Sequence, residues 1–135
     1  MAKISGIGDY LAVDNASSGV VDISNDVTSA TLNNGMDLGT VTGIDSSNVE
    51  RLGLLKDASI VINGVFNASS SHTVFSTLGT ERSVTYAVGG NTSSNPKFTF
   101  EGLITNYDTE RSESGELTWS ATLELASGSA AWGTV

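Results

Sequence analysis

The stretch Leu117-Thr118-Trp119-Ser120-Ala121-Thr122-Leu123-Glu124-Leu125 decides the fold. Its apolar residues occupy every second position, and threonine, serine and glutamate fill the positions between them. Because successive side chains of a strand point to opposite faces, this alternation predicts a strand with one buried face and one wet, faintly acidic face. Trp119, Leu123 and Leu125 are therefore candidates for the core.

A second strand-like stretch precedes this one, and together they predict a long hairpin. Residues 97–107 read Lys-Phe-Thr-Phe-Glu-Gly-Leu-Ile-Thr-Asn-Tyr, a composition rich in the aromatic and β-branched side chains that favour strands. Residues 108–116 are polar, as expected of a hairpin tip. Six acidic residues and one basic residue, Arg111, lie between Glu101 and Glu124. The simplest interpretation of these charges is a solvated tip.

The remaining chain also favours strands, with one helix. Extended segments are expected at residues 10–14, 20–24, 27–32, 57–67 and 83–88. Apolar residues fall on both faces of residues 57–67, which predicts a central strand covered on both sides. Residues 71–79 begin after a serine, carry spaced apolar residues and end at glycine, so they predict one short α-helix. The fold class is mainly β, a β-sandwich or barrel-like domain.

Residues 33–55 do not fit a helix or a strand pattern. They contain four glycines and the polar run Asp45-Ser46-Ser47-Asn48. A connection of this length is long for a compact domain, and such loops are usually functional or disordered. We expect a long loop or arm that becomes ordered by contact with another molecule; a loop without such a contact is the alternative.

Length and composition limit the possible classes of protein. The 135 residues predict a single domain, 1–135, and the net charge of −9 disfavours binding to nucleic acid or to anionic membrane surfaces. The chain has no cysteine, so disulfides and thiolate metal sites are excluded. The first residues lack the apolar stretch of a signal peptide, which predicts folding in the cytoplasm.

The residues that carry enzyme chemistry are sparse. His72 is the only histidine, and we expect it to be exposed in the first turn of the helix. Asp22-x-Ser24-x-Asp26 resembles the start of a calcium loop, but Val27 and Asn33 stand where glycine and glutamate are needed. Glu110 and Glu113 lie in a polar tip without signs of a pocket. We expect no enzyme, no cofactor and no bound metal.

The whole chain resembles the tail tube (major tail) proteins of long-tailed, non-contractile bacteriophages of the siphovirus type, especially those of actinobacterial hosts. The resemblance depends on the order of several short motifs, which are Val21-Asp22-Ile23-Ser24, Leu38-Gly39-Thr40-Val41-Thr42, Gly53-Leu54-Leu55-Lys56-Asp57, Lys97-Phe98, Gly102-Leu103-Ile104-Thr105-Asn106-Tyr107, Leu117-Thr118-Trp119 and Ala131-Trp132-Gly133-Thr134. It implies a structural protein of the virion tail, assembled in the host cytoplasm.

The resemblance also implies partners and surfaces. Six copies would form a ring, and stacked rings would form a tube with the tape measure, terminator and distal tail proteins as neighbours. Double-stranded DNA would pass through without specific binding, and no membrane is involved. Residues on the wet face of the hairpin are candidates for the channel lining: Thr99, Glu101, Thr118, Thr122 and Glu124. Candidates for contacts between copies come from the arm and the tip: Leu38, Val41, Ile44, Arg51, Leu54, Glu110, Arg111 and Glu113.

Two other classes stay open at this stage. A monomeric all-β module that decorates a virion or binds carbohydrate would need an exposed aromatic platform, for which Tyr10, Tyr86, Tyr107 and Trp132 are candidates. A hydrolase would need His72, and we expect its replacement by alanine to have no effect.

Overall fold

The computed structural model describes residues 8–15, 19–45, 47–90 and 92–135, without the side chains of residues 127 and 129. One short helix and seven strands follow each other along the chain: β1 (Tyr10–Asp14), β2 (Val20–Asp22), β3 (Val27–Thr40), β4 (Arg51–Val65), α1 (Ser71–Phe75), β5 (Glu81–Ala87), β6 (Pro96–Arg111) and β7 (Leu117–Thr134). The expected mainly-β fold with one short helix is confirmed. The helix of the described residues is not long and apolar enough to cross a membrane.

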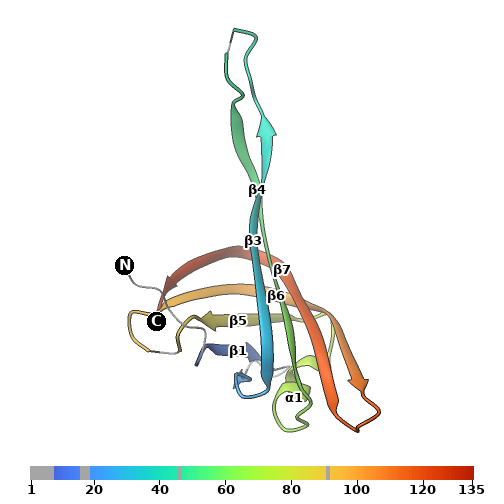
Figure 1. The fold of residues 1–135 in the computed structure, drawn as a ribbon. Coiled ribbons are helices and arrows are strands. Elements are labelled where there is room, and N and C mark those ends of the chain that lie inside the picture. Colours follow the sequence, from blue (N-terminus) through green and yellow to red (C-terminus); the bar gives the residue numbers. More distant parts are fainter. Residues whose placement is uncertain (1–7, 16–18, 46, 91) are drawn as a thin grey trace.

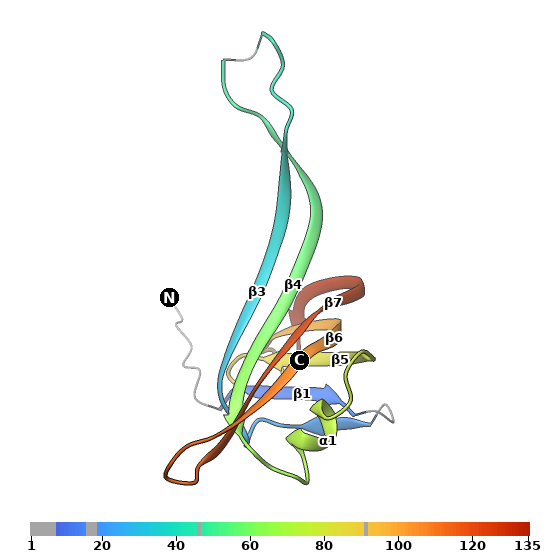
Figure 2. The ribbon, with the colours of Figure 1, turned by 90° about the vertical axis from the view of Figure 1, so that its right-hand side faces the viewer.

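All seven strands belong to one antiparallel sheet in the order β2-β1-β5-β6-β7-β4-β3. The long strands β6 and β7 bend where their register shifts, near Thr99–Asn106, and the bend divides the sheet into two halves (Figures 1 and 2). The arm half comprises residues 27–33 of β3, 59–65 of β4, 104–111 of β6 and 117–124 of β7. The back half comprises β1, β2, β5, residues 96–103 of β6 and the remainder of β7. The strands of the two halves cross, as in a sandwich.

The core lies between these halves, where the alternation in β7 predicts it. Trp119, Ala121 and Leu123 are buried, and Leu125 packs at the edge of the same cluster. Their partners in the core are mainly aromatic and β-branched: Leu11, Val13, Ile23, Ile60, Ile62, Val84, Phe98, Phe100 and Ile104. Burial of side chains of this size contributes roughly 1.5–3 kcal/mol each, so this cluster is the main source of stability.

The helix is shorter than the sequence predicts, ending at Phe75 instead of residue 79. Ser70 does not cap it, because its hydroxyl donates to the Asp26 carboxylate. The guanidinium of Arg82 donates to the carbonyl oxygens of Val74 (3.1 Å) and Thr77 (3.2 Å). These carbonyls therefore bond to Arg82 instead of to a further helical turn, and Leu78 is left half-exposed.

The arm expected at residues 33–55 is present, but the prediction that it is an irregular loop is wrong. β3 extends to Thr40 and β4 begins at Arg51, so the two strands form a β-hairpin that projects from the body, with residues 41–45 and 47–50 outside the strands (Figures 1 and 2). Cross-strand pairing satisfies the backbone, while glycines and apolar residues on both faces hide the period-two pattern. We call residues 34–57 the arm.

The central strand at residues 57–67 is also only partly as predicted. β4 lies between β7 and β3, and Ile60 and Ile62 are buried, but on the other face Val61 is half-buried and Val65 is 52% exposed. In a single copy the second face of this strand is open.

Replacement of Gly64 by alanine is expected to lower the free energy of unfolding by roughly 2–3 kcal/mol. A Cβ at Gly64 would lie 2.3 Å from the carbonyl oxygen of Asp26 and 2.8 Å from Cζ2 of Trp119. That carbonyl accepts a hydrogen bond from the backbone N–H of Val65, so it is not free to move away. Urea unfolding measures the loss. Gly35→Ala is the control, because no heavy atom lies within 4 Å of its Cβ; equal stability of the two variants would contradict the prediction.

Candidate self-assembly surfaces

The arm half of the sheet has two free edges. β3 is the last strand on one side, and its outer edge pairs with no described residue. On the other side β5 pairs with β6 only as far as Leu103, so residues 104–111 of β6 also have a free outer edge. Free strand edges present unpaired N–H and C=O groups, and natural proteins rarely leave edges this long uncovered. The two edges are therefore candidate contact surfaces.

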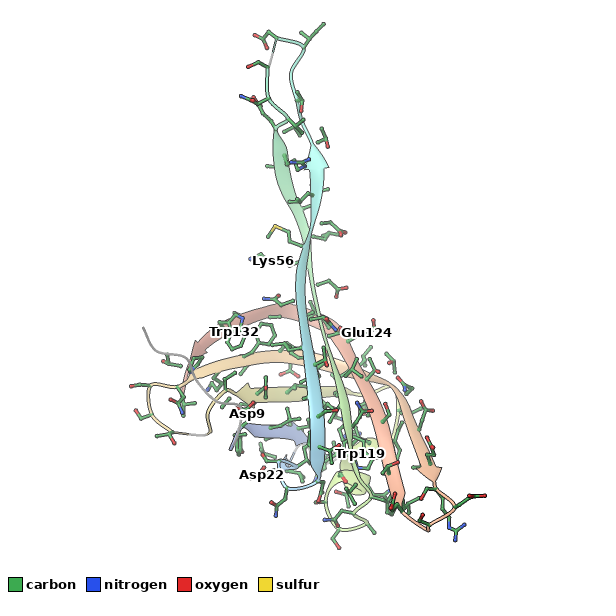
Figure 3. All side chains as sticks on the ribbon, in the orientation of Figure 1. Asp9, Asp22, Lys56, Trp119, Glu124 and Trp132 are labelled. Atoms are coloured by element: carbon green, nitrogen blue, oxygen red, sulfur yellow. The ribbon has the colours of Figure 1, made fainter. Side chains whose placement is uncertain are left out.

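The open face of the arm half is polar. Thr118, Thr122 and Glu124 lie on it, with Val65, Val61 and Ser59 beside them on β4. Side-chain hydrogen bonds cross between strands, from Asn63 Nδ2 to Ser29 Oγ (3.1 Å) and from Asn33 Nδ2 to Ser59 Oγ (3.5 Å). The described residues facing this way include no lysine or arginine, and their charges are the acids Asp108, Glu110 and Glu124. Figure 3 shows Glu124 near the bend of β7 and Trp119 further along the strand, at the level of α1.

The structure separates the channel-lining candidates into two groups. Thr118, Thr122 and Glu124 share the open face of the arm half. Thr99 and Glu101 lie on the part of β6 that pairs with β5, where Glu101 Oε1 accepts a hydrogen bond of 2.5 Å from Ser83 Oγ. These two residues therefore belong to the back half of the sheet.

The arm carries exposed apolar side chains on both of its strands. The candidates Leu38, Val41 and Leu54 are 52–61% exposed, Ile44 is fully exposed, and Arg51 is exposed beside them. Sequence reasoning missed four further residues of the same kind, Met36, Val49, Leu52 and Leu55. The short apolar run Leu52–Leu55 could have indicated these residues, because a loop exposed to solvent rarely contains such a run. Met36 packs over Gly53, and Leu54 packs against Gly39, so bulky side chains cross the hairpin over glycines.

The polar tip is shorter than the sequence predicts. β6 continues to Arg111, so the turn comprises residues 112–116, with Gly115 at φ +92°. The turn closes through backbone hydrogen bonds from Ser112 to Glu116 (3.0 Å) and from Gly115 to Ser112 (3.0 Å). Glu110, Arg111 and Glu113 are all exposed there. Alternation places Glu110 on the open face and Arg111 on the core side of β6.

Asp22 and Asp26, the two acids of the calcium-loop-like sequence, have partners within the fold. Asp22 Oδ1 accepts hydrogen bonds from the Ser24 hydroxyl (2.6 Å) and backbone N–H (3.0 Å). Asp26 is buried: desolvation raises the pKa of its carboxyl, but hydrogen bonds from Ser70, Asn67 and Ser71 outweigh this and hold the pKa below its usual value. Among the described residues no three histidines or acids form a group that could hold a metal ion.

His72 is not the exposed residue that the sequence predicts. It is half-buried in an aromatic cluster, 5.1 Å from the Phe66 ring and 5.9 Å from the Tyr107 ring. Its Nδ1 lies 3.4 Å from the Tyr107 hydroxyl. Tyr107 also packs against Phe75 and Trp119, and burial raises the pKa of its phenol. These ring contacts pack the short helix against β6 and β7.

The four candidate aromatic residues do not form one platform. Tyr107 belongs to the cluster under α1, whereas Trp132, half-exposed, packs edge-on against Phe98 with ring centroids 5.1 Å apart. Tyr10 and Tyr86 line a cleft between β1 and β3. The Tyr86 hydroxyl donates to Asp9 (2.6 Å), and burial together with Asp9 raises the pKa of Tyr86 to about 12.

Solved structures with the same arrangement come from tails and injection systems. One is from the tail of an empty gene transfer agent (GTA) particle with C6 symmetry; it is 19% identical, covers 98% of this chain and 99% of its own, and has a TM-score of 0.72. The chain has the tail tube fold. A second match is from the virion of a native GTA particle, with 18% identity, coverage of 91% and 95%, and a TM-score of 0.68.

The tail tube fold is also found in a contractile system. A third match is from the PVC sheath–tube complex of an extracellular contractile injection system in the extended state, with 11% identity, coverage of 98% and 93%, and a TM-score of 0.69. Neither the protein-family models nor the curated sequences match the chain. At these identities the comparisons establish the fold of the chain, which is the tail tube fold.

Proposed function

We propose that the chain is a structural subunit of a tail tube, which forms six-membered rings that stack into a tube and conduct double-stranded DNA. The observation that carries the proposal is the arm half of the sheet, a four-stranded layer with two free edges and an open polar face. The C6 symmetry of a GTA tail with the same fold supports the number of copies. The protein has no catalytic role in this assignment.

The two free edges fit each other. The arm half has an even number of alternating strands, so β3 and β6 run in opposite directions. The outer edge of β3 in one copy and the outer edge of β6 in the next are thus suited to antiparallel pairing around a ring. A closed ring leaves no free edge, which removes the tendency of such edges to pair with unrelated chains.

The open face of the arm half is the proposed channel wall. Duplex DNA carries about one negative charge per 1.7 Å of its axis, and lysine or arginine would bind its phosphates. A wall of Thr118, Thr122 and Glu124, with Asp108 and Glu110 on β6, repels DNA and offers it no anchoring cation. Thr99 and Glu101 lie in the back half and fall outside this proposed wall.

The arm is the proposed contact between rings. It continues two strands of the arm half beyond the sheet, and its apolar side chains are exposed in a single copy (Figure 2). Burial of these eight exposed side chains contributes roughly 5–10 kcal/mol per copy. The exposed tip, with Glu110, Arg111 and Glu113, is a further contact between copies.

The finer assignment is a non-contractile, siphovirus-type tail, as found in phages of actinobacteria. The ordered motifs of the sequence support it. In that setting the tube assembles in the host cytoplasm, becomes part of the virion tail and contacts the tape measure, terminator and distal tail proteins. Neither a membrane nor a cofactor has a role.

Purified protein is expected to form rings and tubes with a central channel. Negative-stain electron microscopy and light scattering over a range of protein concentrations provide the test. A protein that stays monomeric at millimolar concentration would overturn the proposal. Binding on a glycan array by such a monomer would instead favour a carbohydrate-binding module.

A further inference from the structure

A cleft opens beneath the free edge of β3, between the two halves of the sheet. It has a volume of about 650 Å³. Residues 27–30 of β3 form one wall, and the opposite wall includes Asp9, Tyr10, Asp22, Ser24, Asn25 and Tyr86. Tyr86 belongs to the partly buried residues around the core, so the cleft lies on the core side of β3, away from the open face.

The cleft is negatively charged and no cation lines it. Asp9 accepts hydrogen bonds from the Tyr86 hydroxyl (2.6 Å) and the Gly89 N–H (2.7 Å), so both of its oxygens have partners. Asp22 is exposed and uses only Oδ1 in its hydrogen bonds to Ser24. Figure 3 shows both aspartates beside β1. Asp22 therefore has an oxygen available for a donor from outside the chain.

The guanidinium of Arg111 has no hydrogen-bond or ion-pair partner among the described residues. It is exposed at the end of the free edge of β6, on the core side of that strand, and no described carboxylate pairs with it. Arg111 lies opposite Leu117; the Leu117 carbonyl binds the Phe66 N–H, and the Val65 N–H binds the Asp26 carbonyl. Across the arm half, Arg111 is thus level with residues 25–26, which directly precede β3 and include Asn25 of the cleft wall.

Pairing of the two free edges brings this donor to this cleft. When β6 of a neighbouring copy extends the sheet beside β3, its core-side residues face the same way as the core side of β3. Glu110 of that copy then stays on the channel face, while Arg111 turns toward the cleft. A shift of one residue in register would exchange the two side chains, so the charge pattern also selects the register.

We propose that Arg111 of each copy enters this cleft in the next copy around the ring and forms an ion pair with Asp22. The inference rests on the proposed ring and names the contact that orients it. An arginine in a cleft between copies is well suited to the role, because its planar fork binds carboxylates with fixed geometry. The contact is heterologous, with a tip on one side and a cleft on the other, so it closes into a ring instead of a two-fold dimer.

The test uses two charge-reversal variants, Arg111→Asp and Asp22→Arg. Each variant alone places like charges at every contact, so the protein concentration needed for assembly is expected to rise at least tenfold. In an equimolar mixture, alternating copies restore an opposite-charge pair at every contact of a six-membered ring. Assembly of the mixture is therefore expected to return close to that of the unmodified protein, as measured by light scattering and negative stain.

The control is Lys97→Asp, which makes the same charge change as Arg111→Asp on the same strand, but lies in the back half of the sheet, where β6 pairs with β5. The protein concentration that this control needs for assembly is expected to lie within about twofold of that for the unmodified protein. If both reversal variants assemble normally, or if the mixture of folded variants assembles no better than either alone, the Arg111–Asp22 contact is overturned. A different result would overturn the proposed function, namely an unmodified protein that stays monomeric.

A second measurement does not depend on a charge-reversed protein. The chain has no cysteine, so the double variant Arg111→Cys, Asp22→Cys carries the only two thiols. A short bis-maleimide is expected to link it into a ladder of covalent oligomers that ends at the ring. Each single-cysteine variant should give little more than monomer. The contact is overturned if the double variant, treated with the cross-linker in assembled tubes, yields monomers and no linked oligomers.

Discussion

Replacement of the arm by a tight turn is expected to abolish tube formation while the body remains folded. The variant joins Asn34 to Ala58 through Asn-Gly in place of residues 35–57. Asn34 and Ala58 face each other in the β3–β4 ladder, so a two-residue turn suits the connection. The buried core includes Ala58 but no residue of the replaced segment. Thermal unfolding should therefore stay cooperative, with a midpoint within a few degrees of the unmodified protein.

The expected loss of stacking follows from the apolar surface of the arm. Without its roughly 5–10 kcal/mol per copy, tubes should be absent even at protein concentrations about 100-fold above those that the unmodified protein needs. A full-length arm with Leu38, Leu52, Leu54 and Leu55 replaced by serine separates apolar contact from mere length. Both variants should form at most single rings in negative stain. Tubes of normal length from either variant would contradict a role for the arm in stacking.

Replacement of Arg82 by methionine is expected to cost roughly 3–5 kcal/mol of folding free energy. Arg82 is 1% exposed, and its guanidinium donates to Thr80 Oγ1 (2.8 Å) and to three carbonyl oxygens, those of Asp14 (2.9 Å), Val74 and Thr77. It therefore links β1, β5 and the end of α1. Methionine fills part of the volume but leaves these acceptors without a donor, which is costly in a buried site.

The size of this effect relative to total stability makes it readily measured. Domains of this length are stable by about 5–15 kcal/mol, so the variant should lose a large fraction and unfold roughly 10 °C or more below the unmodified protein. Arg82→Lys should recover only part of the loss, because a single ammonium lacks the planar fork. Arg51→Ala, on the exposed arm, serves as the control and should change stability by less than about 0.5 kcal/mol. Equal effects of the Arg82 and Arg51 variants would refute the role of Arg82.

The sequence contained enough information to predict the strands that have one buried face. In β7 the alternation of Trp119, Ala121 and Leu123 with polar residues reports burial directly, because the period of the side chains equals the period of the strand. The same pattern did not reveal the arm as a hairpin. Its side chains are apolar on both faces, so no alternation marks its strands, although cross-strand hydrogen bonds hold them.

Other features depend on residues that are distant in the chain. Arg82 reads as an ordinary surface arginine, and only the approach of β1 and α1 surrounds it with carbonyl oxygens. The order of strands decides which edges of β3 and β6 remain free, and the bend in β6 assigns Thr99 and Thr118 to different halves of the sheet. Local sequence sets which face of each strand is wet because that depends on neighbouring side chains alone. Strand order and bending set where those faces and edges meet, because they depend on contacts across the whole chain.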